Sequence, residues 1–196
     1  MLRDSWKLAK DSILDTTIRS QLDNIGSEDG QIQNKAYLFL MEKTEKPVDW
    51  VYDVWDELVR DLAHKDNHVR AIASQLLANL AISDSQGRIF RDFGKLLDVT
   101  RDERFVTARH CLQSLWKVGL AGRKQQQLVL NGLEKRFKEC VREKNTTLIR
   151  YDIIVDFRNL YNSVKDEAIK QKALELIEIE KDLKYKKKYN SVWRKH

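Results

Sequence analysis

The stretch HKDNHVRAIASQLLANLA, residues 64–81, decides how the rest of the chain is interpreted. A short polar segment around Asp66 is followed by the pair Val69-Arg70, and then by small and aliphatic residues at helical spacing. Apolar residues that recur at intervals of three, four and seven predict an amphipathic helix, here over about residues 67–82. An Asp before such a helix can accept hydrogen bonds from the free backbone N–H groups of the first turn. The question is whether this helix is one element or one copy of a repeated unit.

Two further segments carry similar residue types at the same offsets. Counted from Asp66, the pattern places Val, Arg, Ala and two Leu at +3, +4, +7, +10 and +11. Residues 29–40 have Ile, Gln, Ala, Phe and Leu at these offsets, and residues 166–177 have Ile, Lys, Ala, Leu and Ile. The match around Asp102 is looser. Asp29, Asp66 and Asp102 stand 37 and 36 residues apart, which is room for two helices and two turns.

The composition agrees with a nearly all-helical chain. Only seven Gly and one Pro occur among 196 residues, so few residues break a helix. No apolar run approaches the length of a membrane span, and the charged N-terminus does not resemble a signal peptide. We therefore expect a cytoplasmic protein with reduced Cys111 and Cys140 and no contact with a membrane. The apolar periodicity predicts nine helices, over about residues 4–23, 30–44, 48–63, 67–82, 85–98, 102–118, 123–143 and 146–162 and from Asp166 into the C-terminal segment.

The pattern of residues 64–81 resembles the HEAT repeat, whose second helix opens with Asp, then Val-Arg, then a small residue and leucines. The resemblance covers most of the chain at the level of helix pairing. It implies an all-α, right-handed α-α superhelix, or solenoid, of about four to five helix pairs in one domain over residues 1–180. Residues 181–196 would be a basic helix end or tail. We expect Arg70 to pair with an acidic loop residue of its own or an adjacent repeat.

After residue 120 the helices can be assigned to repeat units in two ways, which differ in the register of the repeat. In one, residues 146–162 and 166–180 are the first and second helix of a pair, with an extra helix before them. In the other, the match at Asp166 is a coincidence of amphipathic patterning. We favour four helix pairs and a capping helix, because the terminal units of such arrays are usually atypical.

The resemblance favours a non-enzymatic scaffold that binds a protein or peptide on its concave surface, without a cofactor. Polar residues of the second helices should line that surface. Arg109, Gln113 and Lys117 follow one another at intervals of four, and Gln75 falls in the corresponding place on the preceding unit. These four residues are the candidate partner-binding set.

Three features suggest other chemistry, and a simpler explanation competes with each. His64 and His68 have a spacing that suits zinc on a helix, but the residues between them predict a turn and no third ligand is evident, so we expect no metal site. His110 and Cys111 are adjacent, yet neighbouring helix residues point about 100° apart, which favours a buried thiol over a nucleophile and base.

The third feature is the segment 49–56. Some DNA glycosylases that remove alkylated bases have a HEAT-like fold with an Asp and tryptophans in the groove. Trp50, Asp53, Trp55 and Asp56 are the nearest equivalents here. This segment lies on the first helix of its pair, which in HEAT arrays lines the convex side. Residues 1–64 also carry eight basic and thirteen acidic residues, a net −5, which is a poor match to phosphates.

The basic residues are concentrated at the C-terminus, and they support nucleic-acid binding as the alternative function. Residues 181–196 contain seven Lys or Arg and one acid, a net +6 that equals the net charge of the whole chain. Such cations can neutralise phosphates, and the aromatic residues among them can stack on bases. A solvated helix end would account for the same pattern. The candidate nucleic-acid-binding residues are Lys184, Lys186, Lys187, Lys188, Arg194 and Lys195.

Overall fold

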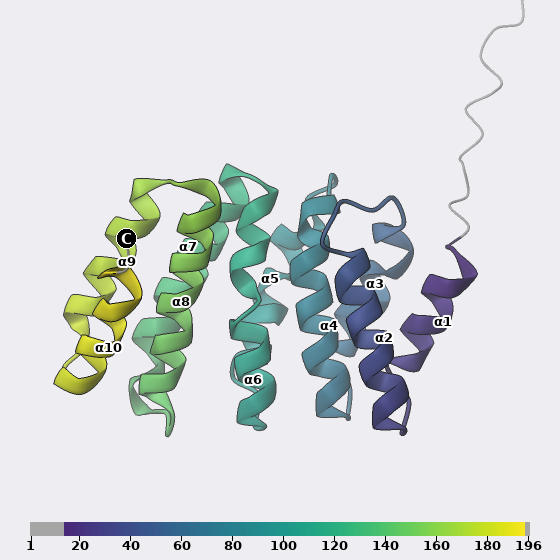
Figure 1. Ribbon diagram of the computed structural model, residues 1–196, viewed down its shortest axis with the longest axis horizontal. Helices are drawn as coiled ribbons and strands as arrows, with labels where there is room; N and C mark the ends of the chain where they lie inside the picture. Colours follow the sequence, from purple (N-terminus) through teal and green to yellow (C-terminus); the bar gives the residue numbers. More distant parts are fainter. Residues whose placement is uncertain (1–13, 195–196) are drawn as a thin grey trace, which may run out of the picture.

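The computed structural model describes residues 14–194 of the chain. This range contains ten α-helices, three 3-10 helices and no strand, which confirms an all-α protein (Figure 1). No helix among the described residues is long and apolar enough to cross a bilayer. The elements are α1 (Thr16–Asn24), α2 (Gly30–Lys43), α3 (Val51–Asp61), α4 (Asn67–Leu80), η1 (Ala81–Ser83), α5 (Arg88–Val99), α6 (Phe105–Leu112), η2 (Leu115–Ala121), α7 (Arg123–Glu139), η3 (Cys140–Arg142), α8 (Thr146–Val164), α9 (Glu167–Ile179) and α10 (Leu183–Arg194).

The helices pack as five consecutive pairs, α1 with α2 through α9 with α10. The second helices α2, α4, α6, α8 and α10 contact one another in succession, and we call them the second-helix layer. On the other side α5, α7 and α9 contact one another in succession. Figure 1 shows the pairs side by side in chain order, from α1 and α2 at one end to α9 and α10 at the other.

This packing decides the register after residue 120. Helix α8 contacts α6 and α10, so it belongs to the second-helix layer, whereas α9 contacts α7 and is the first helix of the fifth pair. The favoured register of four pairs and a capping helix was therefore wrong. The carboxylate of Asp166 does cap α9, accepting from the N–H of Ala168 at 2.9 Å. Its match to Asp29 and Asp66 is a coincidence of amphipathic patterning, because those residues cap helices of the opposite layer.

The predicted helix over 102–118 is two elements. Helix α6 ends at Leu112, and the chain continues as the 3-10 helix η2. The hydroxyl of Ser114 donates to the carbonyl of Cys111 at 2.7 Å, which competes with regular α-helical bonding. Gly119 then lets η2 lie directly on α8, since a Cβ atom there would stand 2.7 Å from Cδ1 of Leu160. The segment η2 contacts α4 and α8 of the second-helix layer as well as α7.

The ends of the chain also differ from the predicted helices. The last helix is interrupted at Glu180, which has an extended backbone and a buried carboxylate that accepts from Nη1 of Arg150 at 3.0 Å. A new helix, α10, starts three residues later. At the other end α1 begins only at Thr16, after the cap Asp15, and residues 4–13 of the predicted first helix lie outside the described range.

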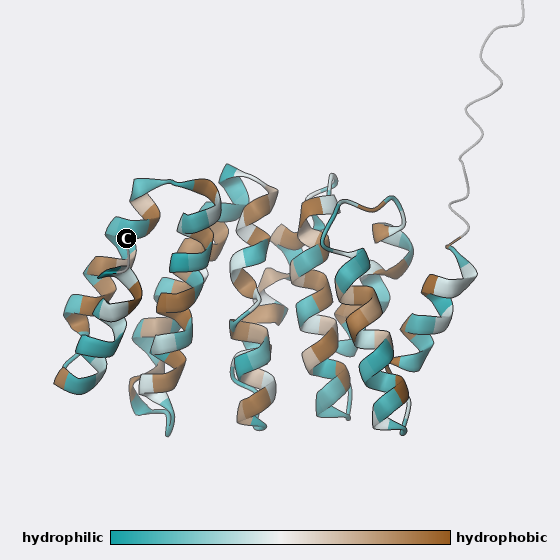
Figure 2. Cartoon of the chain, in the orientation of Figure 1, coloured by the Kyte–Doolittle hydropathy of each residue, from teal (hydrophilic) through white to brown (hydrophobic). Residues whose placement is uncertain are grey.

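Apolar side chains from both layers form one continuous core. Hydrophobic and hydrophilic residues alternate along the ribbons (Figure 2), whereas α4 is buried at every position from Ala71 to Leu80. Burying roughly 25 cal/mol per Å² of apolar surface is the main stabilising contribution to such an arrangement. Side-chain hydrogen bonds then connect neighbouring helix pairs. The indole N–H of Trp55, whose side chain is fully buried, donates to Asp92 of the next pair at 3.0 Å.

The ion pair expected for Arg70 is present and links adjacent pairs. Its guanidinium donates to both carboxylate oxygens of Asp102, through Nε at 2.5 Å and Nη2 at 2.9 Å. The side chains of Arg70 and Asp102 are only 13% and 6% exposed. The same guanidinium donates to the carbonyl of His64 at 2.7 Å, so it also fixes the loop before α4.

Replacing Arg70 with Met should therefore lower the free energy of unfolding by about 2 to 3 kcal/mol, because a largely buried carboxylate loses its partner. The matched control is Arg101→Met, which removes the exposed pair with Glu139, 38% and 43% exposed, and should cost less than about 1 kcal/mol. Urea denaturation followed by circular dichroism measures both. Equal losses in the two variants would contradict this account.

Candidate binding site on the second-helix layer

Two hollows lie on the second-helix layer, bordered by residues from three successive helix pairs. The larger, which we call the Lys117 pocket, has a volume of about 420 Å³. The smaller, the His110 pocket, has a volume of about 230 Å³. The Lys117 pocket is lined by Thr44, Glu45, Asn79, Ile82, Trp116, Lys117 and Leu120. The His110 pocket is lined by Gln33, Asn34, Tyr37, His68, Ala71, Ile72, Gln75 and His110.

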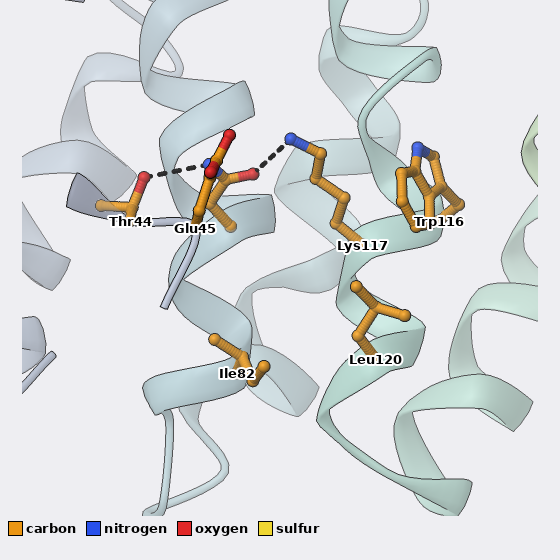
Figure 3. Close-up of a pocket in the computed structure, with 7 residues that line it drawn as sticks. Thr44, Glu45, Ile82, Trp116, Lys117 and Leu120 are labelled. Atoms are coloured by element: carbon orange, nitrogen blue, oxygen red, sulfur yellow. Dashed lines mark hydrogen bonds between the residues drawn. The ribbon is translucent and has the colours of Figure 1, made fainter. Parts of the chain in front are cut away.

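A chain of hydrogen bonds forms the polar wall of the Lys117 pocket. Nζ of Lys117 donates to Oδ1 of Asn79 at 2.8 Å, and Nδ2 of Asn79 donates to Oγ1 of Thr44 at 3.0 Å (Figure 3). The hydroxyl of Thr44 in turn donates to the carbonyl of Leu40 at 2.7 Å. The three side chains come from the ends of α2 and α4 and from η2, so this wall spans three consecutive pairs.

The opposite wall of this pocket is apolar. Figure 3 shows Ile82 and Leu120 below the polar residues, with Trp116 beside Lys117. Ile82 is 37% exposed although it is a large aliphatic residue. The pocket therefore combines a cation with an apolar surface, which is the composition of a site for an amphipathic group.

The ammonium of Lys117 is partly removed from water. Burial lowers the pKa of this group, while the negative charge of Glu45 opposes part of the shift. Among the described residues no carboxylate lies within ion-pair distance of Lys117. The only hydrogen-bond partner of its ammonium there is the neutral amide of Asn79. A cation with a neutral partner in a hollow favours an anionic ligand.

The four predicted partner-binding residues all lie in the second-helix layer or in η2, and each is bonded within the fold. Gln75 is buried, accepts from the hydroxyl of Tyr37 at 3.0 Å and donates to the carbonyl of Ala71 at 3.1 Å. Arg109 donates to both carboxylate oxygens of Asp152, at 2.7 and 2.9 Å, and Gln113 donates to the same carboxylate at 3.2 Å.

Sequence reasoning missed several residues of this surface. It did not identify Tyr37, Asn79 or Trp116. Asn79 follows Gln75 by one helical turn, which was an available signal, whereas Trp116 lies in η2, where the structure departs from the predicted α-helix.

A buried acid lies in α8 one turn beyond Asp152. Asp156 is buried and neither of its carboxylate oxygens makes a hydrogen bond. Burial raises the pKa of Asp156 well above its ordinary value, and the charge of Asp152 raises it further, whereas the nearby backbone N–H of Trp116 opposes the shift. The folded protein therefore holds a proton here that the unfolded chain releases above about pH 4.

The free energy of unfolding should fall as the pH rises from about 4, where the unfolded chain loses this proton, toward the raised pKa of Asp156 in the folded state. Over this range the folded state binds more protons than the unfolded state. The variant Asp156→Asn lacks the titration, so its advantage over the wild type should grow from near zero at about pH 4 to about 1 to 3 kcal/mol at pH 7.5. Urea denaturation at several pH values measures this difference. The exposed Asp98→Asn serves as the control, and a pH-independent difference for Asp156→Asn would contradict the assignment.

The aromatic and acidic residues of segment 49–56 lie on α3, outside the second-helix layer. Trp55 packs in the core. The carboxylate of Asp56 is 70% exposed and contacts Arg88 and Arg91 at 3.3 and 3.4 Å. Asp53 also interacts with another residue. These groups do not line either of the two hollows.

The basic C-terminal segment forms α10, and its aromatic residues pack against α8. Tyr189 is buried and donates to the carbonyl of Thr147 at 2.6 Å, while the ring of Trp193 lies 5.5 Å from that of Tyr161. Tyr189 is therefore not exposed for base stacking, while Tyr161 and Trp193 are half-buried and contact each other. Lys186 contacts Glu178, and Lys195 lies outside the described residues. The exposed cations of this helix are Lys184, Lys187, Lys188 and Arg194.

The two cysteines are buried and do not form a disulfide. The thiol of Cys111 donates to the carbonyl of Leu96 at 3.3 Å, and burial raises its pKa to about 12. A thiolate nucleophile is thus not formed near neutral pH.

No protein-family model matches the chain, and no curated protein matches it either. The interpretation of its function therefore depends on the geometry of the second-helix layer.

Proposed function

We propose that the chain is a HEAT-like scaffold that binds an extended polypeptide along its second-helix layer. In this proposal the five helix pairs form a right-handed superhelix, the second helices line its concave surface, and no reaction is catalysed. The pairing of helices along the chain and the link between Arg70 and Asp102 of successive pairs support the HEAT-like assignment.

The observation that carries the proposal is the position of the two hollows on one layer. Both are bordered by α2 and α4, and both extend to α6 or to η2, which continues it. An extended peptide advances roughly 3.3 Å per residue, so one segment lying along α4 can place different side chains in the two hollows. A single compact ligand would use only one of them.

The polar floor of this surface is already held in place. Tyr37 with Gln75, and Thr44 with Asn79 and Lys117, are bonded across successive pairs before any partner arrives. A partner then orders few side chains of the scaffold when it binds, which reduces the entropic cost of association. The exposed cations of α10, in the same layer, favour a partner with acidic residues.

A random 12-residue peptide library panned on the full chain provides the test. Selected peptides should lose tenfold or more in affinity for Ile82→Arg, which places a long cation in the Lys117 pocket, as measured by fluorescence anisotropy. The control Ile179→Arg makes the same change on α9, outside the second-helix layer, at a residue with similar exposure of 44%. It should leave binding unchanged.

The proposal is refuted if no peptide is selected, or if selected peptides bind both variants as tightly as the wild type. A short DNA duplex measured in the same assay at low and high salt distinguishes the alternative function. Tight, salt-sensitive binding of the duplex, lost when Lys184, Lys187 and Lys188 are changed together to Ala, would favour nucleic acid instead.

A further inference from the structure

We propose that the Lys117 pocket is the anchor of this surface and selects a carboxylate attached to a large apolar group, namely an acidic residue next to a large apolar residue of the bound segment. The inference rests on the proposed function and specifies the chemistry of the partner. It follows from three features of the pocket: a cation with unused donors, a fixed orientation of its neighbours, and an apolar wall beside it.

The ammonium of Lys117 has hydrogen-bonding capacity that the fold does not use. A lysine side chain has three N–H donors, and Asn79 accepts one of them. No further partner is found among residues 14–194. Glu45 lines the same pocket but is exposed and forms no ion pair with Lys117. The remaining donors are therefore available to a carboxylate that enters the pocket.

The hydrogen bonds around Lys117 fix its position. Because the hydroxyl of Thr44 donates to the carbonyl of Leu40, its oxygen must accept from Asn79. The amide nitrogen of Asn79 therefore faces Thr44 and its carbonyl oxygen faces Lys117, as Figure 3 shows by the two dashed lines. Three successive pairs thus hold the ammonium at the edge of the hollow.

The apolar wall determines what else the ligand must carry. Ile82, Leu120 and the ring of Trp116 also line the pocket, and Figure 3 shows Ile82 and Leu120 below Thr44 and Lys117. An aliphatic or aromatic side chain placed there removes the exposed Ile82 from water, which is favourable at about 25 cal/mol per Å². The pocket of about 420 Å³ accommodates such a side chain together with a neighbouring carboxylate.

The charges of the pocket favour a carboxylate over a phosphate. One cation, Lys117, and one anion, Glu45, line it. A phosphate group carries close to two negative charges at neutral pH and would be repelled by Glu45 more strongly than a singly charged carboxylate. The adjoining wall is also apolar, and contact with it adds no binding free energy for a phosphodiester backbone. These properties match an acidic and apolar peptide segment.

The probe for the test is 4-phenylbutyrate, a carboxylate joined to an aromatic group, and its neutral counterpart is 4-phenylbutyramide. Binding to the full chain is followed by chemical-shift changes of the backbone amides of η2 in the ¹⁵N-labelled protein. For a ligand of this size we expect a dissociation constant of about 1 mM, with the carboxylate favoured about tenfold over the amide. Lys117→Met should remove that preference, and the control Lys124→Met, an exposed lysine of α7, should preserve it.

Thermal denaturation should show that Lys117→Met still folds, with a free energy of unfolding within about 1 kcal/mol of the wild type, because removing a desolvated charge offsets the donor that Asn79 loses. Equal binding of the acid and the amide, or a preference that survives in Lys117→Met, overturns the inference. Peptides from the panning experiment that need Ile82 but tolerate Lys117→Met would also overturn it, while the proposed function would stand. Lys117-dependent binding of 4-phenylbutyrate without any selected peptide would support the chemistry of the pocket and refute the proposed function.

Discussion

The structure depends on side-chain hydrogen bonds that connect each helix pair to the next. Trp55 and Asp92 are 37 residues apart, Tyr37 and Gln75 are 38 apart, and Lys117 and Asn79 are 38 apart. These separations are close to the 36 and 37 residues between successive Asp positions in the sequence. In an array where each pair contacts mainly its neighbours, apolar packing alone would allow adjacent pairs to slide or rotate. A directional bond between corresponding positions of adjacent pairs fixes their register.

The same bonds prepare the surface that we propose to bind a partner. On the second-helix layer most of the polar side chains that were candidates for binding a partner already make hydrogen bonds or ion pairs within the fold. Gln75 is satisfied by Tyr37 and a backbone carbonyl, and Arg109 by Asp152. Lys117 differs because its partner is a neutral amide and not a carboxylate. In the proposed function, specific recognition is therefore concentrated at the Lys117 pocket, while the other polar residues provide a rigid frame around it.

Local patterns in the sequence were sufficient to predict the parts of the fold that local physics determines. The cap at Asp66 and the pairing of Arg70 with an acid of the next unit both follow from residue types near a helix start. The breaks after α6 and α9 did not follow, because apolar periodicity continues through both. They depend on contacts with α8, where Gly119 meets Leu160 and Arg150 meets Glu180. The candidate site was predicted only in part for the same reason, since Lys117 was identified but its neighbour Trp116 in η2 was not.

Three departures from regular architecture coincide around η2. The segment is a 3-10 helix where the sequence predicts an α-helix, Lys117 holds a partly desolvated charge, and Asp156 behind it is a buried acid without a hydrogen bond. The desolvated charge and the buried acid each lower stability. Elsewhere in the second-helix layer, as at Arg109 and Arg150, buried or partly buried charges are paired. We propose that residues 115–121 serve the Lys117 pocket, which three of them line.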